Sequence, residues 1–168
     1  MQYITRTALR LVIGLWCLTT FAGCDGFQCP PCNATVTWNS YGDFEFTKEG
    51  DDATARRLVS ECNWHVQGGH NGGVGETLQV AACGNEGVTL GWAFNEFHAF
   101  RLADGWQGKT KEGIGIGASL ADFLAVYRNF TQTNSTSYQL SKDDVNVEAN
   151  FDQNGTLKEL IVGDFFRR

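Results

Sequence analysis

The sequence lacks an apolar run long enough to cross a bilayer, and it lacks a basic patch. Its longest apolar stretch, residues 11–21, is about half of the ~20 residues that a membrane-spanning helix needs. Lysine and arginine together number 13 against 19 aspartates and glutamates, which gives a net charge of −6. No stretch concentrates the basic residues. Spanning helices are therefore excluded, and nucleic acids and anionic lipid surfaces are poor partners for this chain.

A complete nucleotide-binding motif is also missing, although residues 105–123 (GWQGKTKEGIGIGASLADF) contain a G-K-T and a run of glycines. A Walker loop would need a glycine at the position of Ala103 and a helix directly after the G-K-T. The match to the dinucleotide pattern at residues 113–118 follows no buried strand. We therefore predict no nucleotide and no cofactor, and we expect Ile114 and Ile116 to enter the core from a short extended segment.

The beginning of the chain is organised as an export signal. Arg6 and Arg10 form a basic start, residues 11–21 form a short apolar core, and two small residues precede Cys24. This order resembles the lipobox of bacterial lipoproteins, in which the peptidase draws an extended backbone with small side chains into a narrow groove. The resemblance implies a signal peptide at residues 1–23.

The same resemblance makes Cys24 the lipidated residue and residues 24–34 a tether to the folded domain. Several acyl chains on one cysteine anchor a protein stably, whereas a single chain is marginal. The mature chain would keep 11 basic and 19 acidic residues, a net charge of −8, because the signal removes two arginines and no acids. Asp25 resembles the signal that retains lipoproteins at the inner membrane. The expected location is the cell envelope, on the extracytoplasmic side of a membrane.

Beyond Cys24, the mature chain has four cysteines: Cys29, Cys32, Cys62 and Cys83. An even number in an exported chain predicts two disulfides. The sequence leaves three pairings open, and we favour Cys62 with Cys83 and Cys29 with Cys32. The C-P-P-C spacing also occurs in redox pairs and in zinc sites. Here it follows no strand, and the chain contains no second C-x-x-C, so we expect a structural role.

Periodicity predicts two helices and several strands. Apolar residues at helical spacing place helices at residues 51–64 and after Ser119, where Asp122 completes a pattern that resembles a capping box. The glycine-rich residues 67–76 predict a loop. The turn D-Q-N-G predicts a C-terminal hairpin. Strands are expected at residues 35–40, 43–47, 77–83, 88–102 with a bend at 95–96, 138–140, 145–151 and 156–166.

The segment GIGIGASLADFLAVY, residues 113–127, resembles the start of the helix in small envelope modules of the β-lactamase-inhibitor-protein-like group. That group also contains small outer-membrane assembly lipoproteins, and its modules pack a short helix on an antiparallel sheet. The resemblance implies an α+β fold and a protein-binding or scaffold role. We expect one antiparallel sheet with two short helices on one face. Its parts are a cysteine-containing half at 35–104 and a helix-plus-hairpin module at 105–168, with 52–94 as the candidate for a degenerate earlier copy.

Residues that could carry chemistry are few. His65 and His70 lie five residues apart beside the glycine-rich segment, a spacing that could bind a metal if a helix or strand fixed it. We favour solvent-exposed histidines and predict no metal site. Glu96 and His98 could form an acid–base pair on one face of a strand, but no recognisable nucleophile accompanies them. We therefore predict no catalytic residue and no enzymatic activity.

The tryptophans provide one more candidate site. Trp92 and Trp106, with His98, form a possible binding surface for a sugar or a peptide, although packing in the core is the favoured use of such rings. The sequence thus favours a lipid-anchored, non-catalytic envelope protein that binds or scaffolds another protein. A small-ligand binding module is the alternative, and an envelope hydrolase comes third. An exposed apolar patch would support the first, and a closed pocket with convergent polar groups the second.

Overall fold

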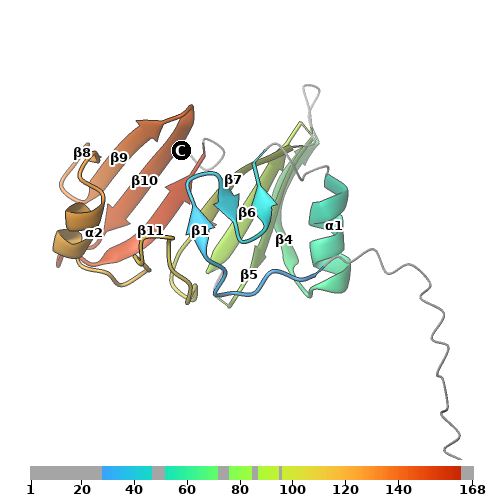
Figure 1. Cartoon of the computed structure of the whole chain (residues 1–168). Coiled ribbons are helices and arrows are strands. Elements are labelled where there is room, and N and C mark those ends of the chain that lie inside the picture. Colours follow the sequence, from blue (N-terminus) through green and yellow to red (C-terminus); the bar gives the residue numbers. More distant parts are fainter. Residues whose placement is uncertain (1–27, 47–51, 72–75, 85–86, 95, 164–168) are drawn as a thin grey trace, which may run out of the picture.

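The computed structural model describes residues 28–46, 52–71, 76–84, 87–94 and 96–163 (Figure 1). The predicted signal peptide, Cys24 and Asp25 lie outside these residues. Among the helices in the described ranges, none has both the length and the apolar character that crossing a membrane requires.

An antiparallel sheet of eight strands forms most of the fold. Its strand order is β4-β5-β6-β7-β11-β10-β9-β8, so β7 and β11 meet in the middle, with Leu102 opposite Leu160. The strands are β4 (His65–Asn71), β5 (Glu76–Ala82), β6 (Val88–Ala93), β7 (Glu96–Leu102), β8 (Thr131–Gln132), β9 (Ser137–Lys142), β10 (Val145–Phe151) and β11 (Leu157–Val162).

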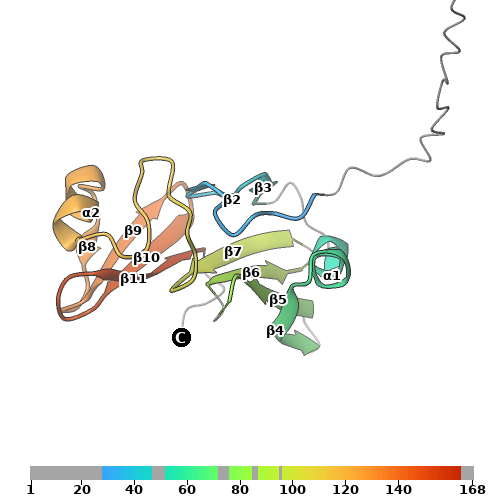
Figure 2. The ribbon, with the colours of Figure 1, turned by 90° about the horizontal axis from the view of Figure 1, so that it is seen from below.

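The fold repeats one order of elements twice. Helix α1 (Asp52–Glu61) precedes β4 to β7, and helix α2 (Leu120–Val126) precedes β8 to β11. We call residues 52–102 the first unit and residues 120–162 the second unit. Both helices lie on the same side of the sheet, here called the helix side, and the opposite side is called the outer face (Figure 2). The predicted α+β class, with two short helices on one face of an antiparallel sheet, is confirmed.

A small three-stranded sheet also lies on the helix side (Figure 2). Its strands are β1 (Val36–Thr37), β2 (Ser40–Tyr41) and β3 (Phe44–Glu45). The prediction of one strand over 35–40 is wrong, because the chain turns at Trp38 and Asn39, where the Thr37 hydroxyl donates to Asn39 Oδ1 at 2.7 Å. Phe46 follows β3 and packs its ring 4.9 Å from that of Phe97 on the main sheet.

The core lies on the helix side because alternate residues of each strand point there. Strand register aligns one apolar row across six strands: Val80, Leu90, Phe100, Val162, Val147 and Leu140. Helix α1 adds Ala55 and Leu58, and α2 adds Phe123, all with 0% exposure. Burial of each large side chain contributes roughly 1.5–3 kcal/mol, so this row and the two helices hold the units together.

Two predicted boundaries in the first unit are wrong. The predicted loop at 67–76 includes most of β4. This edge strand forms through hydrogen bonds between its backbone and that of β5, and such pairing tolerates glycine. The predicted bent strand at 88–102 is a hairpin of β6 and β7. Its turn includes Phe94, whose φ of 53° lies in the left-handed region that reverses the chain.

The second unit matches its sequence signals more closely. Ser119 caps α2: its Oγ accepts from the Asp122 N–H at 3.1 Å and donates to Asp122 Oδ2 at 2.7 Å. This confirms Ser119 as the N-cap of α2, although Asp122 accepts from the serine hydroxyl and not from the serine backbone N–H as in a standard capping box. The C-terminal hairpin of β10 and β11 is also confirmed, and Asp152 Oδ1 accepts from the backbone N–H of Asn154 and of Thr156, each at 2.9 Å, in its turn.

Two disulfides tie the start of the described chain to the first unit. Cys29 joins Cys62 directly after α1, and Cys32 joins Cys83 directly after β5, with Cα–Cα distances of 5.4 and 5.5 Å. The favoured pairing of Cys29 with Cys32 and Cys62 with Cys83 is therefore wrong. The intervening prolines favour extended backbone, in which three steps span about 9 Å, more than a disulfide bridges. Each cysteine consequently reaches a different element.

Candidate functional site

The outer face of the main sheet carries mostly polar side chains. The sequence neighbours of the apolar core row point to this side and form a second row across six strands. This row consists of Ala81, Thr89, Arg101, Ile161, Glu148 and Gln139. The described helices and the small sheet all lie on the other side (Figure 2). Ala81, Thr89 and Ile161 are buried, so Arg101, Glu148 and Gln139 form the accessible part of this row.

A hydrogen-bonded network crosses four strands of the outer face, and we call it the polar array. Arg101 on β7 forms an ion pair with Glu159 on β11. Asn150 on β10 donates from Nδ2 to Glu159 Oε2 at 3.0 Å and to Glu148 Oε1 at 2.9 Å. Gln139 on β9 donates to Glu148 Oε2 at 3.0 Å. These bonds hold the side chains of the polar array in fixed positions, and preorganisation of this kind lowers the entropic cost of association in general.

Phe94 is the exposed aromatic residue beside this face. Its side chain is 65% exposed on the β6–β7 turn, and its ring centroid lies 6.5 Å from that of His98. A bulky residue with φ of 53° is strained, and such strain persists where the surrounding structure enforces the conformation. Phe94 could not be identified from the sequence, because nothing in the local pattern distinguishes an exposed turn phenylalanine from a core one.

The predicted binding surface is only partly right. Trp92 and Trp106 are 1% and 4% exposed, so they are core residues and not surface residues. Trp92 lies on the helix side of β6, next to Phe97 at 5.1 Å between ring centroids. His98 is partly exposed on the outer face, and its Nε2 lies 3.7 Å from Glu96 Oε2, so these two side chains do lie together. They form an open pair at the surface.

The other predicted residues lie on β4, at the edge of the sheet and three strands from His98 on β7. His65 is exposed at the start of β4, and His70 lies further along the same strand. Among the described residues, no group of three or more histidine, cysteine or acidic side chains is arranged to hold a metal ion.

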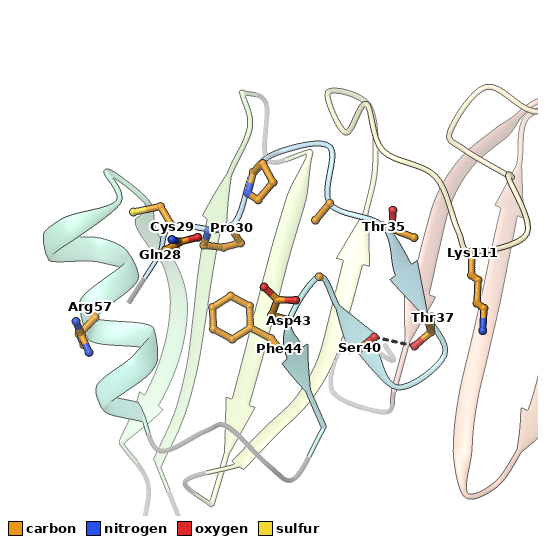
Figure 3. Close-up of a pocket in the computed structure, with 13 residues that line it drawn as sticks. Gln28, Cys29, Pro30, Thr35, Thr37, Ser40, Asp43, Phe44, Arg57 and Lys111 are labelled. Atoms are coloured by element: carbon orange, nitrogen blue, oxygen red, sulfur yellow. Dashed lines mark hydrogen bonds between the residues drawn. The ribbon is translucent and has the colours of Figure 1, made fainter. Parts of the chain in front are cut away.

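A cleft of about 830 Å³ opens on the helix side, between the start of the described chain, α1 and the small sheet (Figure 3). Pro30 and Phe44 supply apolar wall. Thr37 and Ser40, hydrogen-bonded to each other at 2.8 Å, supply hydroxyl groups. Asp43 adds a carboxylate near the middle of the cleft. The cleft thus combines one acid with neutral donors and acceptors.

Two cations border this cleft at its opposite sides. Arg57 extends from α1, where it donates to Glu61 at 2.8 Å, and Lys111 extends from the turn after Thr110 (Figure 3). Because Arg57 forms an ion pair with Glu61, the charge of Arg57 is partly neutralised within the helix. The cleft is open to solvent and has no enclosed polar centre, so it resembles a groove more than a closed ligand site.

The G-K-T segment has a structural role in this arrangement. Thr110 is 3% exposed, and its Oγ1 accepts from the Ile114 N–H at 3.1 Å and lies 2.6 Å from the Tyr127 hydroxyl oxygen. The Tyr127 hydroxyl also donates to Glu112 Oε2 at 2.7 Å. Burial raises the pKa of Tyr127, and the Glu112 charge acts in the same direction. Gly108 packs against the backbone of Ala34.

Comparison with known proteins supports the fold and nothing finer. No family model matches the sequence, and no curated protein matches it. A solved structure from Escherichia coli, described as the uncharacterized protein yfeY, is similar with a TM-score of 0.51 and 10% sequence identity. The similarity covers 78% of this chain and 100% of that chain. At this identity the likeness concerns architecture: an α+β protein built on a large antiparallel sheet.

Proposed function

We propose that the protein is a lipid-anchored component of the cell envelope that binds another protein through its outer face and performs no catalysis. The export-signal pattern before Cys24 supports the anchor. The two disulfides support an oxidising compartment, because such bonds persist mainly outside the cytosol. The exposed Phe94 on the β6–β7 turn, next to His98, is the observation that carries the binding role.

The physical argument follows the general anatomy of protein interfaces. Aromatic anchors contribute most of the binding energy, and a polar surround excludes water and selects the partner. Phe94 and His98 supply the anchor, and Glu96 beside His98 supplies a polar neighbour. The polar array begins farther along the same face, at Arg101 near the end of β7. The strain at Phe94 is tolerated because β6 and β7 hold the turn on both sides.

A photocrosslinking experiment in the native host tests this proposal. The amino acid p-benzoylphenylalanine replaces Phe94 in one strain and Val126, which is 42% exposed on α2, in a control strain. We expect a discrete higher-mass adduct from position 94 that position 126 does not give. No adduct from position 94, or the same adduct from both positions, would contradict the proposed surface.

A matched variant separates binding from stability. Glycine accepts a φ of 53° without the steric cost of roughly 1–2 kcal/mol that an L-residue bears there. Phe94→Gly is therefore expected to keep or raise the thermal midpoint while it weakens partner binding. A variant that unfolds at a clearly lower temperature would mean that Phe94 serves the fold and not a partner.

The intact mass of the mature protein tests the anchor separately. Detergent-extracted protein should have the mass of residues 24–168 plus a diacylglyceryl group, with two disulfides formed. An unlipidated mass would contradict the lipid anchor and leave a secreted binding domain as the interpretation. The alternative, a small-ligand module, would use the cleft on the helix side. It is supported if Asp43→Asn abolishes binding of a sugar or peptide found by ligand screening.

A further inference from the structure

We infer that the bilayer faces the helix side of the first unit at its disulfide end, and that the outer face points away from the lipid into the aqueous space. This inference rests on the proposed acylation of Cys24. The partner of this side of the protein is the lipid surface into which those acyl chains insert. The disulfide end is defined by residues 28–32 together with Cys62 and Cys83.

The length of the chain between the anchor and the fold carries the argument. Only residues 25–27 separate Cys24 from Gln28. Four fully extended steps reach about 14 Å, so Gln28 lies no farther than that from the acylated cysteine. One residue later, Cys29 is bonded to Cys62 at the end of α1, so no further slack is available. A domain of this size has a radius of gyration of about 14 Å, which makes the tether short compared with the body.

The position of Gln28 decides which surface this short tether brings to the lipid. Residues from 28 onward run along the helix side of the sheet, beside α1 and over the cleft (Figures 2 and 3). The outer face lies on the opposite side of the sheet. Phe94 also lies at the far end of β6 from Val88, which pairs with Ala82 next to Cys83. Six residues of strand separate the two ends by about 20 Å.

The charge of the membrane-facing corner is compatible with a lipid surface. Helix α1 contains two arginines and two acids, and residues 62–68 contain no charged residue, in a chain with a net charge of −6. Val66 on β4 is an exposed apolar side chain at this corner, with 54% exposure. Phosphate groups therefore meet a neutral surface here, while the partner-binding surface keeps its access to water.

Crosslinking to lipid tests the orientation with the acylated full-length protein. The protein carries p-benzoylphenylalanine at Ser60, exposed near the end of α1, or at Phe94, and is reconstituted in vesicles of phosphatidylethanolamine and phosphatidylglycerol. Flotation with the vesicles is measured first. We expect the variant with the probe at position 60 to crosslink strongly to phospholipid. The variant with the probe at position 94 should crosslink only weakly.

A tether variant provides the control. Insertion of a flexible Gly/Ser segment of about 20 residues between Phe27 and Gln28 adds a root-mean-square reach of roughly 25 Å. It should abolish the preference of position 60 for lipid without changing flotation. Equal crosslinking at both positions, or stronger crosslinking at Phe94, would overturn the orientation alone. Failure of the native protein to float would overturn the anchor and the orientation together.

Discussion

Gly108 provides the sharpest test of how the G-K-T segment is used. A Cβ on this residue would lie 2.5 Å from the carbonyl oxygen of Ala34 and 2.6 Å from Nε1 of Trp106. Separations below 3.0 Å force atoms to move. Neither neighbour can move easily, because Ala34 is 7% exposed and Trp106 is 4% exposed. Gly108→Ala is therefore expected to disturb the contact between the G-K-T segment and the start of the described chain.

The size of the effect follows from overpacking. Extra methyl groups in a packed region cost about 1–3 kcal/mol, and two tight contacts with a backbone oxygen and an indole place this substitution near 2 kcal/mol. For a domain of this length, a loss of that size lowers the thermal midpoint by roughly 6–8 °C. The carbonyl of Ala34 belongs to the wall of the helix-side cleft, so the cleft should be perturbed as well.

Urea and thermal unfolding, followed by circular dichroism and tryptophan fluorescence, measure this change. Gly68→Ala is the matched control, because a Cβ there would meet only Gln79 Oε1 at 3.7 Å and its Cδ at 3.8 Å, which are ordinary contacts. We expect Gly68→Ala to unfold near the midpoint of the unsubstituted protein. If Gly108→Ala is as stable as Gly68→Ala, the packing role assigned to the G-K-T segment is refuted.

Three further predictions concern cross-links, protons and caps. Replacing Cys32 and Cys83 by serine opens a loop with a sequence separation of 51 and should lower the free energy of unfolding by about 4 kcal/mol, as measured in urea. Burial raises the pKa of Tyr41 and Tyr127, so both hold their protons more tightly when folded. Their contribution to stability is intact below about pH 10 and is lost as the pH rises above it, which urea midpoints across alkaline pH would show. Ser119→Ala removes the acceptor of the Asp122 N–H and should cost about 1 kcal/mol, whereas Ser119→Asp should restore most of that loss.

The second unit could be predicted from sequence because its signals are local. A serine three residues before an aspartate defines the start of α2. Two segments of alternating apolar and polar residues, joined by the turn D-Q-N-G, define β10 and β11. Each of these signals acts within a few residues, where backbone preference and side-chain hydrogen bonds decide the conformation. The strand β8 was missed because two residues in a polar segment carry no periodic signal.

The first unit and the site could be predicted only in outline, because their determinants are distant in sequence. β4 is a strand because β5 pairs with it, and its own glycines indicate a loop. The disulfide partners depend on where α1 and β5 end in space. Whether an aromatic residue is buried depends on the whole sheet: Trp92 faces the helices, whereas Phe94, two residues later, is exposed on a turn.

The second unit is specified by local sequence signals, whereas the first unit depends on covalent cross-links. The second unit contains a capped helix and tight hairpins and, within the described residues, no disulfide. The first unit has a glycine-rich edge strand and is flanked by the two-residue strands of the small sheet, elements with little stability of their own. Both disulfides end in this unit, directly after α1 and β5. Because a cross-link acts mainly by restricting the unfolded chain, it stabilises a segment whose own sequence does not specify its structure. The same bonds fix the start of the described chain, so the features that fold the first unit also determine how an anchored protein would present its outer face.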